Sequence, residues 1–165
     1  MSKVVVTGGT GFIGSHVCVD LIEKGYEVLI IDSLVNSDSK VVKNILNIYS
    51  NDISIKKKIS FIKADLINKN EIDEIFQDLI NQGQEISAVI HLAGLKAVKE
   101  SIEKPFSYWE NNVIGAYNLL SVMDKYNCRT FVFSSSATIY DNAGGNLIDE
   151  TFMIRPDNPY GKTKS

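Results

Sequence analysis

The sequence of 165 residues has few of the residues that mark several classes of protein. Its two cysteines, Cys18 and Cys128, form no Cys-x-x-Cys pair, so we expect small buried apolar residues in a reducing compartment. Its two histidines, His16 and His91, have no paired ligand spacing and are interpreted as structural, without a metal site. No apolar run is long enough to span a bilayer, and the N-terminus lacks a signal-peptide core. These absences predict a cytoplasmic protein.

The net charge of the sequence is also small. The 17 lysines and arginines and the 20 aspartates and glutamates give a net charge of -3. This balance offers no attraction for nucleic acid or an anionic membrane, so we expect neither as a partner. The lysine run at residues 56–58 is interpreted as a solvated loop. With 44% apolar and 22% charged residues, the chain is expected to form one soluble globular domain.

A glycine-rich turn between an apolar strand and an amphipathic helix is the first informative feature. Valines at residues 4–6 predict a buried parallel strand, and Gly8, Gly11 and Gly14 follow it. Gly8 permits a tight turn, Gly11 lets a pyrophosphate approach the backbone, and Gly14 lets the helix lie close to the strand. This context predicts dinucleotide phosphates at the helix N-terminus. The helix is expected to bury Ile13, Val17 and Leu21, with Cys18 and Ile22 beside them.

Acidic residues end the next two expected strands. The strand at 27–31 ends at Asp32, near the offset from the glycines at which a carboxylate accepts hydrogen bonds from an adenosine ribose. A carboxylate there repels a 2′-phosphate, so the expected cofactor is NAD rather than NADP. The strand at 59–63 leads to Asp65, which could bond an adenine ring or could simply begin a helix. The spacing leaves both roles for Asp65 open.

Strands and helices continue to alternate along the chain. Further strands are expected at 88–92 and 131–133, and helices at 41–48 and 72–80. Five strands that alternate with helices predict an α/β fold with a doubly wound parallel sheet of the Rossmann type. Ligands bind at the carboxyl ends of such strands. One edge should therefore gather the glycine turn, Asp32, Asp65, residues 93–94 and the serines at 134–136.

A long helix is expected to begin at Pro105, because proline favours the first helical turn. Two apolar stripes run along it, so it must be covered on two sides. The sheet covers one side, and the other is covered by a partner helix in a dimer or by another helix of the same chain. The first stripe is Trp109, Val113, Ala116, Leu120 and Met123, and the second is Tyr108, Leu119, Val122 and Tyr126.

A Tyr-x-x-x-Lys motif, Tyr160 to Lys164, lies near the end of the sequence. On a helix these two side chains lie one turn apart on one face. A tyrosine hydroxyl ordinarily ionises only near pH ~10, so a base at neutral pH needs a nearby ammonium to favour the phenolate. A serine hydroxyl after the fifth strand can bond the same substrate oxygen. The combination predicts acid–base catalysis beside a dinucleotide.

With these motifs the chain resembles the extended short-chain dehydrogenase/reductases, and among them the UDP-glucose 4-epimerases. The resemblance covers essentially the whole chain. The glycine turn and the tyrosine motif are shared by many nucleotide-sugar enzymes, whereas 93–98 and the serine triplet are closer to the 4-epimerase pattern. The segments that carry it are residues 7–16, 91–98, 110–113, 134–138 and 158–164.

The resemblance implies an NAD-dependent isomerase that interconverts UDP-galactose and UDP-glucose through a 4-keto intermediate. It implies that Tyr160 is the acid–base for the sugar 4-hydroxyl, that Lys164 favours the phenolate and binds the nicotinamide ribose, and that Ser136 polarises the 4-oxygen. Implied substrate contacts are Lys96, Ser136 and Tyr160. Implied cofactor contacts are Gly8, Gly11, Phe12, Ile13, Gly14, Asp32, Asn36, Ser37, Asp65, Leu66, Leu92, Ala93, Gly94, Lys96, Asn111, Tyr160 and Lys164.

The sequence departs from this family in two places. Asp141 stands where glycine is usual and begins an unusual loop to Asn146, and the sequence stops at Ser165, one residue after Lys164. We therefore expect residues 1–165 to be an incomplete NAD-binding Rossmann domain without the substrate domain, inactive alone, and a homodimer in the full-length protein.

Two other functions compete with epimerisation. A nucleotide-sugar 4,6-dehydratase needs an acid pair where Ala137 and Thr138 stand, which argues against β-elimination. A non-catalytic NAD-binding module that senses redox state has no need of a base, and the set of Ser136, Tyr160 and Lys164 argues against it.

Overall fold

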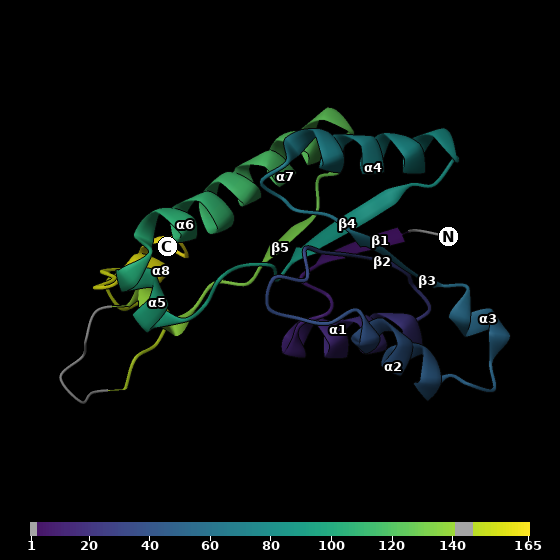
Figure 1. Cartoon of the computed structure of the whole chain (residues 1–165), viewed down its shortest axis with the longest axis horizontal. Coiled ribbons are helices and arrows are strands. Elements are labelled where there is room, and N and C mark those ends of the chain that lie inside the picture. Colours follow the sequence, from purple (N-terminus) through teal and green to yellow (C-terminus); the bar gives the residue numbers. More distant parts are fainter. Residues whose placement is uncertain (1–2, 141–146) are drawn as a thin grey trace.

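The computed structural model describes residues 3–140 and 147–165. Five parallel strands form one sheet in the order β3-β2-β1-β4-β5 (Figure 1). The chain moves outward from β1 to β3 and then returns to the other side of β1, which confirms the doubly wound α/β fold. The strands are β1 (Lys3–Thr7), β2 (Glu27–Asp32), β3 (Ile59–Lys63), β4 (Ile86–His91) and β5 (Phe131–Phe133).

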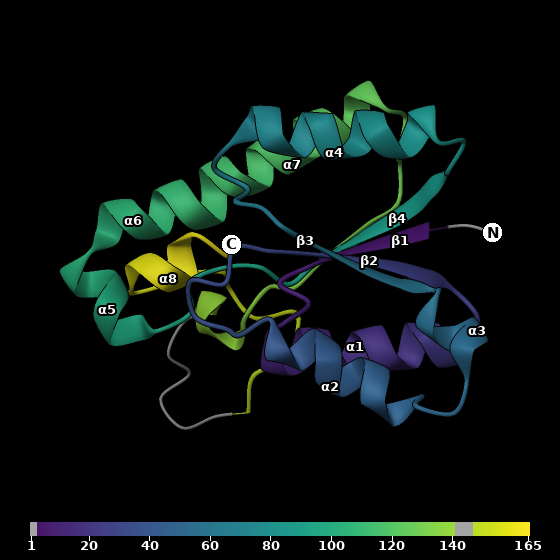
Figure 2. The same ribbon diagram turned by 45° about the vertical axis from the view of Figure 1, so that its right-hand side comes forward.

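Helices cover both faces of the sheet. On one face lie α1 (Phe12–Glu23) and α2 (Lys40–Ile48). On the other lie α4 (Lys69–Asn81) and a long helix that runs through α6 (Pro105–Trp109), the π-helical η1 (Glu110–Ile114) and α7 (Gly115–Lys125), as Figures 1 and 2 show. Within residues 3–140 and 147–165 no helix is both long and apolar enough to cross a membrane.

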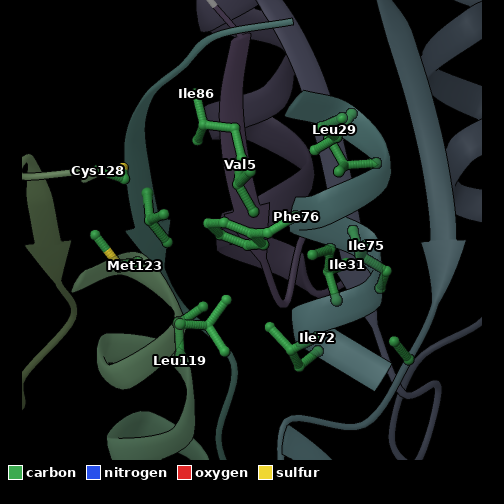
Figure 3. Packing of buried hydrophobic residues seen from close by; sticks show 14 of the residues in the cluster. Val5, Leu29, Ile31, Ile72, Ile75, Phe76, Ile86, Leu119, Met123 and Cys128 are labelled. Carbon is green, nitrogen blue, oxygen red and sulfur yellow. The ribbon is translucent and has the colours of Figure 1, made fainter. Parts of the chain in front are cut away.

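Each face of the sheet has its own apolar core, so the central strands are buried on both sides. Figure 3 shows Phe76 of α4 packed between the sheet and Leu119 of α7. On the opposite face, Cys18 and Ile22 of α1 pack against Val4 and Val6 of β1. The two cores fix the strand order and hence the place where the strands end together.

The register of α1 differs from the expected one. The buried row is Gly14, Cys18 and Ile22, whereas Ile13 is 60% exposed. Gly14 has no side chain and lies directly against the backbone of Gly8 and Gly9, so the row that starts at residue 14 faces the sheet. The expectation that Ile13 is buried was therefore wrong, and Ile13 instead borders the cleft described below.

The two apolar stripes of the long helix are buried to different extents. The second stripe is buried at Tyr108, Leu119 and Val122, but Trp109 and Leu120 of the first stripe are 43% and 44% exposed. The buried residues Tyr108, Asn112, Leu119 and Val122 keep an α-helical spacing through the π turn η1, so Trp109 and Leu120 lie on the outer face of the helix.

Four shorter helices lie in the connections of the described chain. The polar connection before β3 contains α3 (Ile53–Lys56), which Asp52 caps by accepting hydrogen bonds from Ser54 N and Ile55 N at 2.9 and 3.3 Å. Our interpretation of this connection as a loop was therefore incomplete. The others are α5 (Val98–Glu103), the 3₁₀ turn η2 (Ala137–Ile139) and α8 (Pro159–Lys162).

Candidate active site

A cleft of ≈ 420 Å³ opens where the carboxyl ends of the strands meet. The turn after β1, the ends of β2, β3 and β4, the serines after β5 and the segment around α8 all line it. Of the expected contacts, the following line the cleft: Gly8, Gly11, Phe12, Ile13, Gly14, Asp32, Asn36, Asp65, Leu66, Leu92, Ala93, Gly94, Lys96, Asn111, Tyr160 and Lys164. Ser134 and Ser135, which we expected at this edge, line the cleft, whereas Ser37 and Ser136 are absent from its lining. Residues that the sequence did not reveal are Ile31, Ser33, Val35, Ala64 and Leu95.

The glycine turn forms an open cradle at one end of the cleft. Gly8 has φ of +72°, and a Cβ there would lie 2.6 Å from Ala93 N. A Cβ on Gly14 would collide with the carbonyl oxygen of Gly8. Among the residues that the structure describes, no side chain caps α1, so the N–H groups of its first turn, at Phe12 and Ile13, are available to an anion. The turn therefore fits a pyrophosphate.

Asp32 is held rigidly at the end of β2. It is buried, its Oδ2 accepts a hydrogen bond from Thr10 N at 3.1 Å, and its Oδ1 accepts from Leu34 N and Ser37 Oγ at 2.9 and 3.1 Å. Leu34 has the left-handed φ of 62°. Ser37 also bonds Thr10 Oγ1 at 2.7 Å. Ser37 thus supports the carboxylate from behind, which explains why it does not line the cleft.

Asp65 fills one of the two roles that the sequence left open, which is to begin a helix. Its Oδ1 accepts a hydrogen bond from Ile67 N at 3.0 Å, and its own N–H donates to Glu71 Oε2 at 3.1 Å, so it organises the entry to α4. It also lines the cleft, together with Leu66. A contact with adenine stays a prediction.

The segment that carries Tyr160 is fixed at both ends. Asn158 caps α8 by accepting a hydrogen bond from Gly161 N at 2.8 Å, and the Tyr160 ring packs edge-on against Tyr108 at 6.4 Å between centroids. The α-helix ends at Lys162, and Lys164 N donates to Gly161 O at 3.0 Å. The one-turn α-helical spacing that we expected is therefore replaced by a tighter last turn. Tyr160 and Lys164 nevertheless line the same cleft.

Lys164 is a buried cation at the floor of the cleft. It is 6% exposed, and its Nζ donates to Ser134 O at 3.1 Å. Across the described parts of the chain, no carboxylate lies within ion-pair distance of it. Burial lowers the pKa of Lys164 from its ordinary value. An ammonium without a carboxylate partner is free to stabilise negative charge that develops in the cleft.

Ser135 and Ser136, which follow β5, both form hydrogen bonds within the chain. Ser136 Oγ lies 2.9 Å from Thr138 Oγ1 and accepts a hydrogen bond from Thr138 N at 3.3 Å, which caps η2. Ser135 Oγ donates to Lys164 O at 2.8 Å. The catalytic role of Ser136 stays a prediction. The unusual loop, Asp141 to Asn146, lies outside the described residues.

Asn112, which the sequence did not single out, ties the site together. It is buried in the π turn, its Oδ1 accepts from Leu95 N at 2.8 Å, and its Nδ2 donates to Leu95 O and Thr163 Oγ1, both at 2.9 Å. It thus joins the loop after β4 to the segment of Lys164. Its place on the buried stripe of Tyr108 and Leu119 was the available signal, because a polar residue there needs partners.

Replacing Asn112 with alanine is expected to lower the free energy of unfolding by about 1–3 kcal/mol, because buried backbone groups lose their partners. Urea unfolding followed by circular dichroism measures this. Asn111→Ala is the matched control, since the neighbouring Asn111 is only partly buried. Equal midpoints for the two variants would contradict the bracing role.

Neither histidine belongs to a group of metal-ligating side chains in the described part of the chain. His91 is buried, shares a 2.7 Å hydrogen bond with Thr7 Oγ1, and is held neutral because burial lowers its pKa to about 4. His16 is exposed on α1, and its ring lies 5.0 Å from that of Phe12 at a tilt of 55°. Among residues 3–140 and 147–165, no three His, Cys, Asp or Glu side chains gather as a metal site requires.

Comparison with known sequences gives consistent relatives. The GDP-mannose 4,6 dehydratase family model matches residues 5–165. UDP-glucose 4-epimerase uge1 of Schizosaccharomyces pombe is 47% identical over 165 residues, which are 98% of this chain and 43% of that protein. UDP-glucose 4-epimerase of Bacillus subtilis is 42% identical over 161 residues, 98% of this chain and 44% of that protein. The chain thus spans less than half the length of these relatives.

Solved structures agree with the sequence relatives. UDP-glucose-4-epimerase from Stenotrophomonas maltophila, with bound NAD and formylated UDP-arabinopyranose, matches with a TM-score of 0.87 and 38% identity, over 99% of this chain and 46% of that one. The Bifidobacterium longum enzyme, in complex with NAD+ and UDP, matches with a TM-score of 0.87 and 35% identity over the same shares. The chain belongs to the GDP-mannose 4,6 dehydratase family, within the extended short-chain dehydrogenase/reductases.

Proposed function

We propose that this chain binds NAD in the cleft and is the dinucleotide-binding part of a UDP-glucose 4-epimerase, which interconverts UDP-galactose and UDP-glucose. One observation carries the proposal: a single cleft is lined by the glycine turn and Asp32 and also by Tyr160 and Lys164. A dinucleotide site and an acid–base pair are thus side by side. The 4-epimerases among the relatives, two of them solved with NAD, support this function.

The residues of the cleft fit NAD from one end to the other. The glycine turn and the first turn of α1 receive the pyrophosphate, and Asp32 accepts hydrogen bonds from the adenosine ribose. The buried charge of Asp32 disfavours a 2′-phosphate, so NAD is preferred over NADP. Further contacts come from Asn36, Asp65, Leu66, Leu92, Ala93, Gly94, Lys96 and Asn111, and Ser37 acts through Asp32.

When bound, the nicotinamide supplies a reversible acceptor for the hydrogen at C4 of the sugar. Tyr160 takes the proton of the 4-hydroxyl as the C4–H bond breaks, and a 4-keto sugar forms. After the keto sugar presents its other face, C4 regains its hydrogen and Tyr160 returns the proton to oxygen. Lys164 stabilises the phenolate before it takes the proton and after it returns it, and Ser136 donates a hydrogen bond to the 4-oxygen.

The family description raises 4,6-dehydration as a second candidate function. That reaction eliminates water across C5 and C6 and needs an acid and a base beside the strand-five serine. Ala137 and Thr138 occupy these positions, and the Thr138 hydroxyl is engaged with Ser136 at 2.9 Å. Neither side chain supplies a carboxyl group, so the residues present favour epimerisation.

The nucleotide released by denaturing the purified protein that carries this chain tests the cofactor, and the product that this protein forms from UDP-galactose tests the reaction. We expect NAD and UDP-glucose. Release of NADP, or a 4-keto-6-deoxy product, would contradict the proposal. We assign dinucleotide binding to residues 1–165. More than half of each relative lies outside the aligned region, and we assign sugar selection to that part.

We also propose that the protein is a homodimer through the outer face of the long helix. Apolar side chains are exposed along that face, and a second copy that presents the same face would bury them. They are Phe106 (86% exposed), Trp109 (43%), Ile114 (48%), Tyr117 (65%) and Leu120 (44%).

Tyr117→Lys is expected to shift the protein from dimer to monomer at micromolar concentration, because it places a charge in the buried face. Sedimentation velocity measures the shift. Tyr26→Lys is the matched control, since Tyr26 is an exposed tyrosine away from the long helix. A wild-type protein that sediments as a monomer would contradict the dimer.

The net charge of -3 supports neither nucleic acid nor an anionic membrane as a partner. Cys18 and Cys128 are free and buried, which is consistent with a reducing compartment, so we propose that the protein works in the cytoplasm.

A further inference from the structure

Three rings form an aromatic wall behind the cleft. Phe131 and Phe133 of β5 flank His91 of β4, with centroid separations of 5.8 and 5.7 Å from the imidazole. The two phenyl rings lie 6.2 Å apart at an angle of 16°. His91 is the register partner of Phe133 across the two strands. The reaction described above assigns no task to any of the three rings.

The ammonium of Lys164 lies on this wall. Its Nζ is 4.8 Å from the centroid of the Phe133 ring, within the range of a cation–π contact. Its hydrogen bond to Ser134 O supplies one further partner at 3.1 Å. Because Lys164 is buried and lacks a carboxylate partner within the described ranges, the ring face and this carbonyl are the main compensation for its lost hydration.

We propose that Phe133 is a positioning residue for Lys164, and that its ring face holds the ammonium charged and aimed at the cleft. An aliphatic side chain would fill the same space but lacks the negative ring face. A carboxylate would hold the ammonium more strongly, but it would neutralise the charge that Tyr160 needs. The aromatic ring therefore stabilises the cation and leaves its field available to the cleft. The catalytic consequence rests on the proposed function, whereas the contact itself does not.

The other groups near Lys164 leave its charge uncompensated. On β4, His91 is neutral, because burial and the nearby Lys164 charge lower its pKa to about 4. On α5, Glu100 is engaged by the Tyr108 hydroxyl at 3.1 Å and by Lys104 at 3.3 Å. β5 itself carries no titratable side chain. The remaining titratable groups are Tyr160 and the exposed Lys162 on α8, and Asp32, Asp65 and Lys96 along the same cleft.

The direct test is an NMR titration of Lys164 in protein labelled with ¹³C-lysine, without added nucleotide. The Lys164 signal is assigned as the one that Lys164→Met removes. Phe133→Leu is expected to lower the pKa of Lys164 by about half to one unit, because the charged form loses the ring face. Phe133→Trp should restore it. Phe131→Leu is the matched control, since Phe131 belongs to the same wall but has no contact of this kind with Lys164.

A second variant separates the ring's charge distribution from its shape. Pentafluorophenylalanine at position 133 keeps the ring but reverses the sign of its face, so Lys164 should titrate lower than in wild type even where Phe133→Leu fails to fold. Unchanged Lys164 titration in the fluorinated protein, or an equal shift in Phe131→Leu, would overturn the proposal.

The pH profile of UDP-galactose turnover by the protein that carries this chain gives the catalytic readout. Its alkaline limb, where Lys164 loses its charge, should move down in Phe133→Leu by the same amount as the NMR titration. If wild type binds no NAD and turns over no sugar, the proposed function fails, and a lowered Lys164 titration would still support the contact. If the titration moves and the alkaline limb does not, the positioning role in catalysis is wrong.

Discussion

Tyr160→Phe is expected to lower turnover of UDP-galactose by roughly 10²- to 10⁴-fold while NAD still binds, because the variant lacks the group that moves the proton. The substitution keeps the ring that packs edge-on against Tyr108, so the fold and the cleft should survive. Coupled detection of UDP-glucose measures turnover, and nucleotide release measures binding.

Tyr126→Phe is the matched control for this loss. Tyr126 lies at the end of α7, where its hydroxyl donates to Asp73 O at 3.4 Å, and it does not line the cleft. Its turnover should stay close to that of wild type. Retention of wild-type turnover by Tyr160→Phe would remove the acid–base role. A wild-type protein that binds NAD but turns over no sugar would favour a non-catalytic NAD-binding module.

Gly14→Ala is expected to disrupt the cradle for the pyrophosphate. The new Cβ would collide with the Gly8 carbonyl oxygen and would lie 2.8 Å from Gly9 Cα, so α1 must move away from the turn. Overpacking of this kind costs about 1–3 kcal/mol of unfolding free energy. Each N–H bond to phosphate that is lost should weaken NAD binding about tenfold or more. Thermal unfolding and NAD titration by calorimetry measure the two effects.

A second glycine variant separates stability from binding. Gly83 follows α4 and does not line the cleft. It has φ of +71°, with open space around it. Gly83→Ala should therefore destabilise the fold by about 1 kcal/mol through backbone strain, with NAD affinity unchanged. If Gly14→Ala also leaves NAD affinity unchanged, the glycine turn is not the phosphate site.

The doubly wound parallel sheet and the edge that carries the cleft were predictable from the sequence. Parallel strands end at one edge, so the motif after each strand falls there, and Gly8, Asp32 and Ala93 do line one cleft. This inference needs the alternation of strands and helices but no knowledge of side-chain packing.

Features that depend on local geometry were not predictable. The α1 register follows from the contact of Gly14 with Gly8, and the sequence alone could not show that Trp109 lies on the outer face of its helix. Ser37 donates a hydrogen bond to Asp32 and does not line the cleft, and its expected contact with the cofactor stays a prediction.

The contact between Lys164 and Phe133 also required the structure. It depends on the tight turn after α8 and on which face of β5 the ring occupies. Neither is encoded in the Tyr-x-x-x-Lys spacing.

The fate of a deuterium label at C4 of UDP-galactose tests the central claim most directly. The protein that carries this chain is incubated with the labelled sugar, and the product is examined by NMR. If Tyr160 moves only the hydroxyl proton while the C4 hydrogen leaves and returns within the cleft, UDP-glucose should form with deuterium still at C4. Loss of the deuterium to solvent, or a 6-deoxy product, would contradict this account.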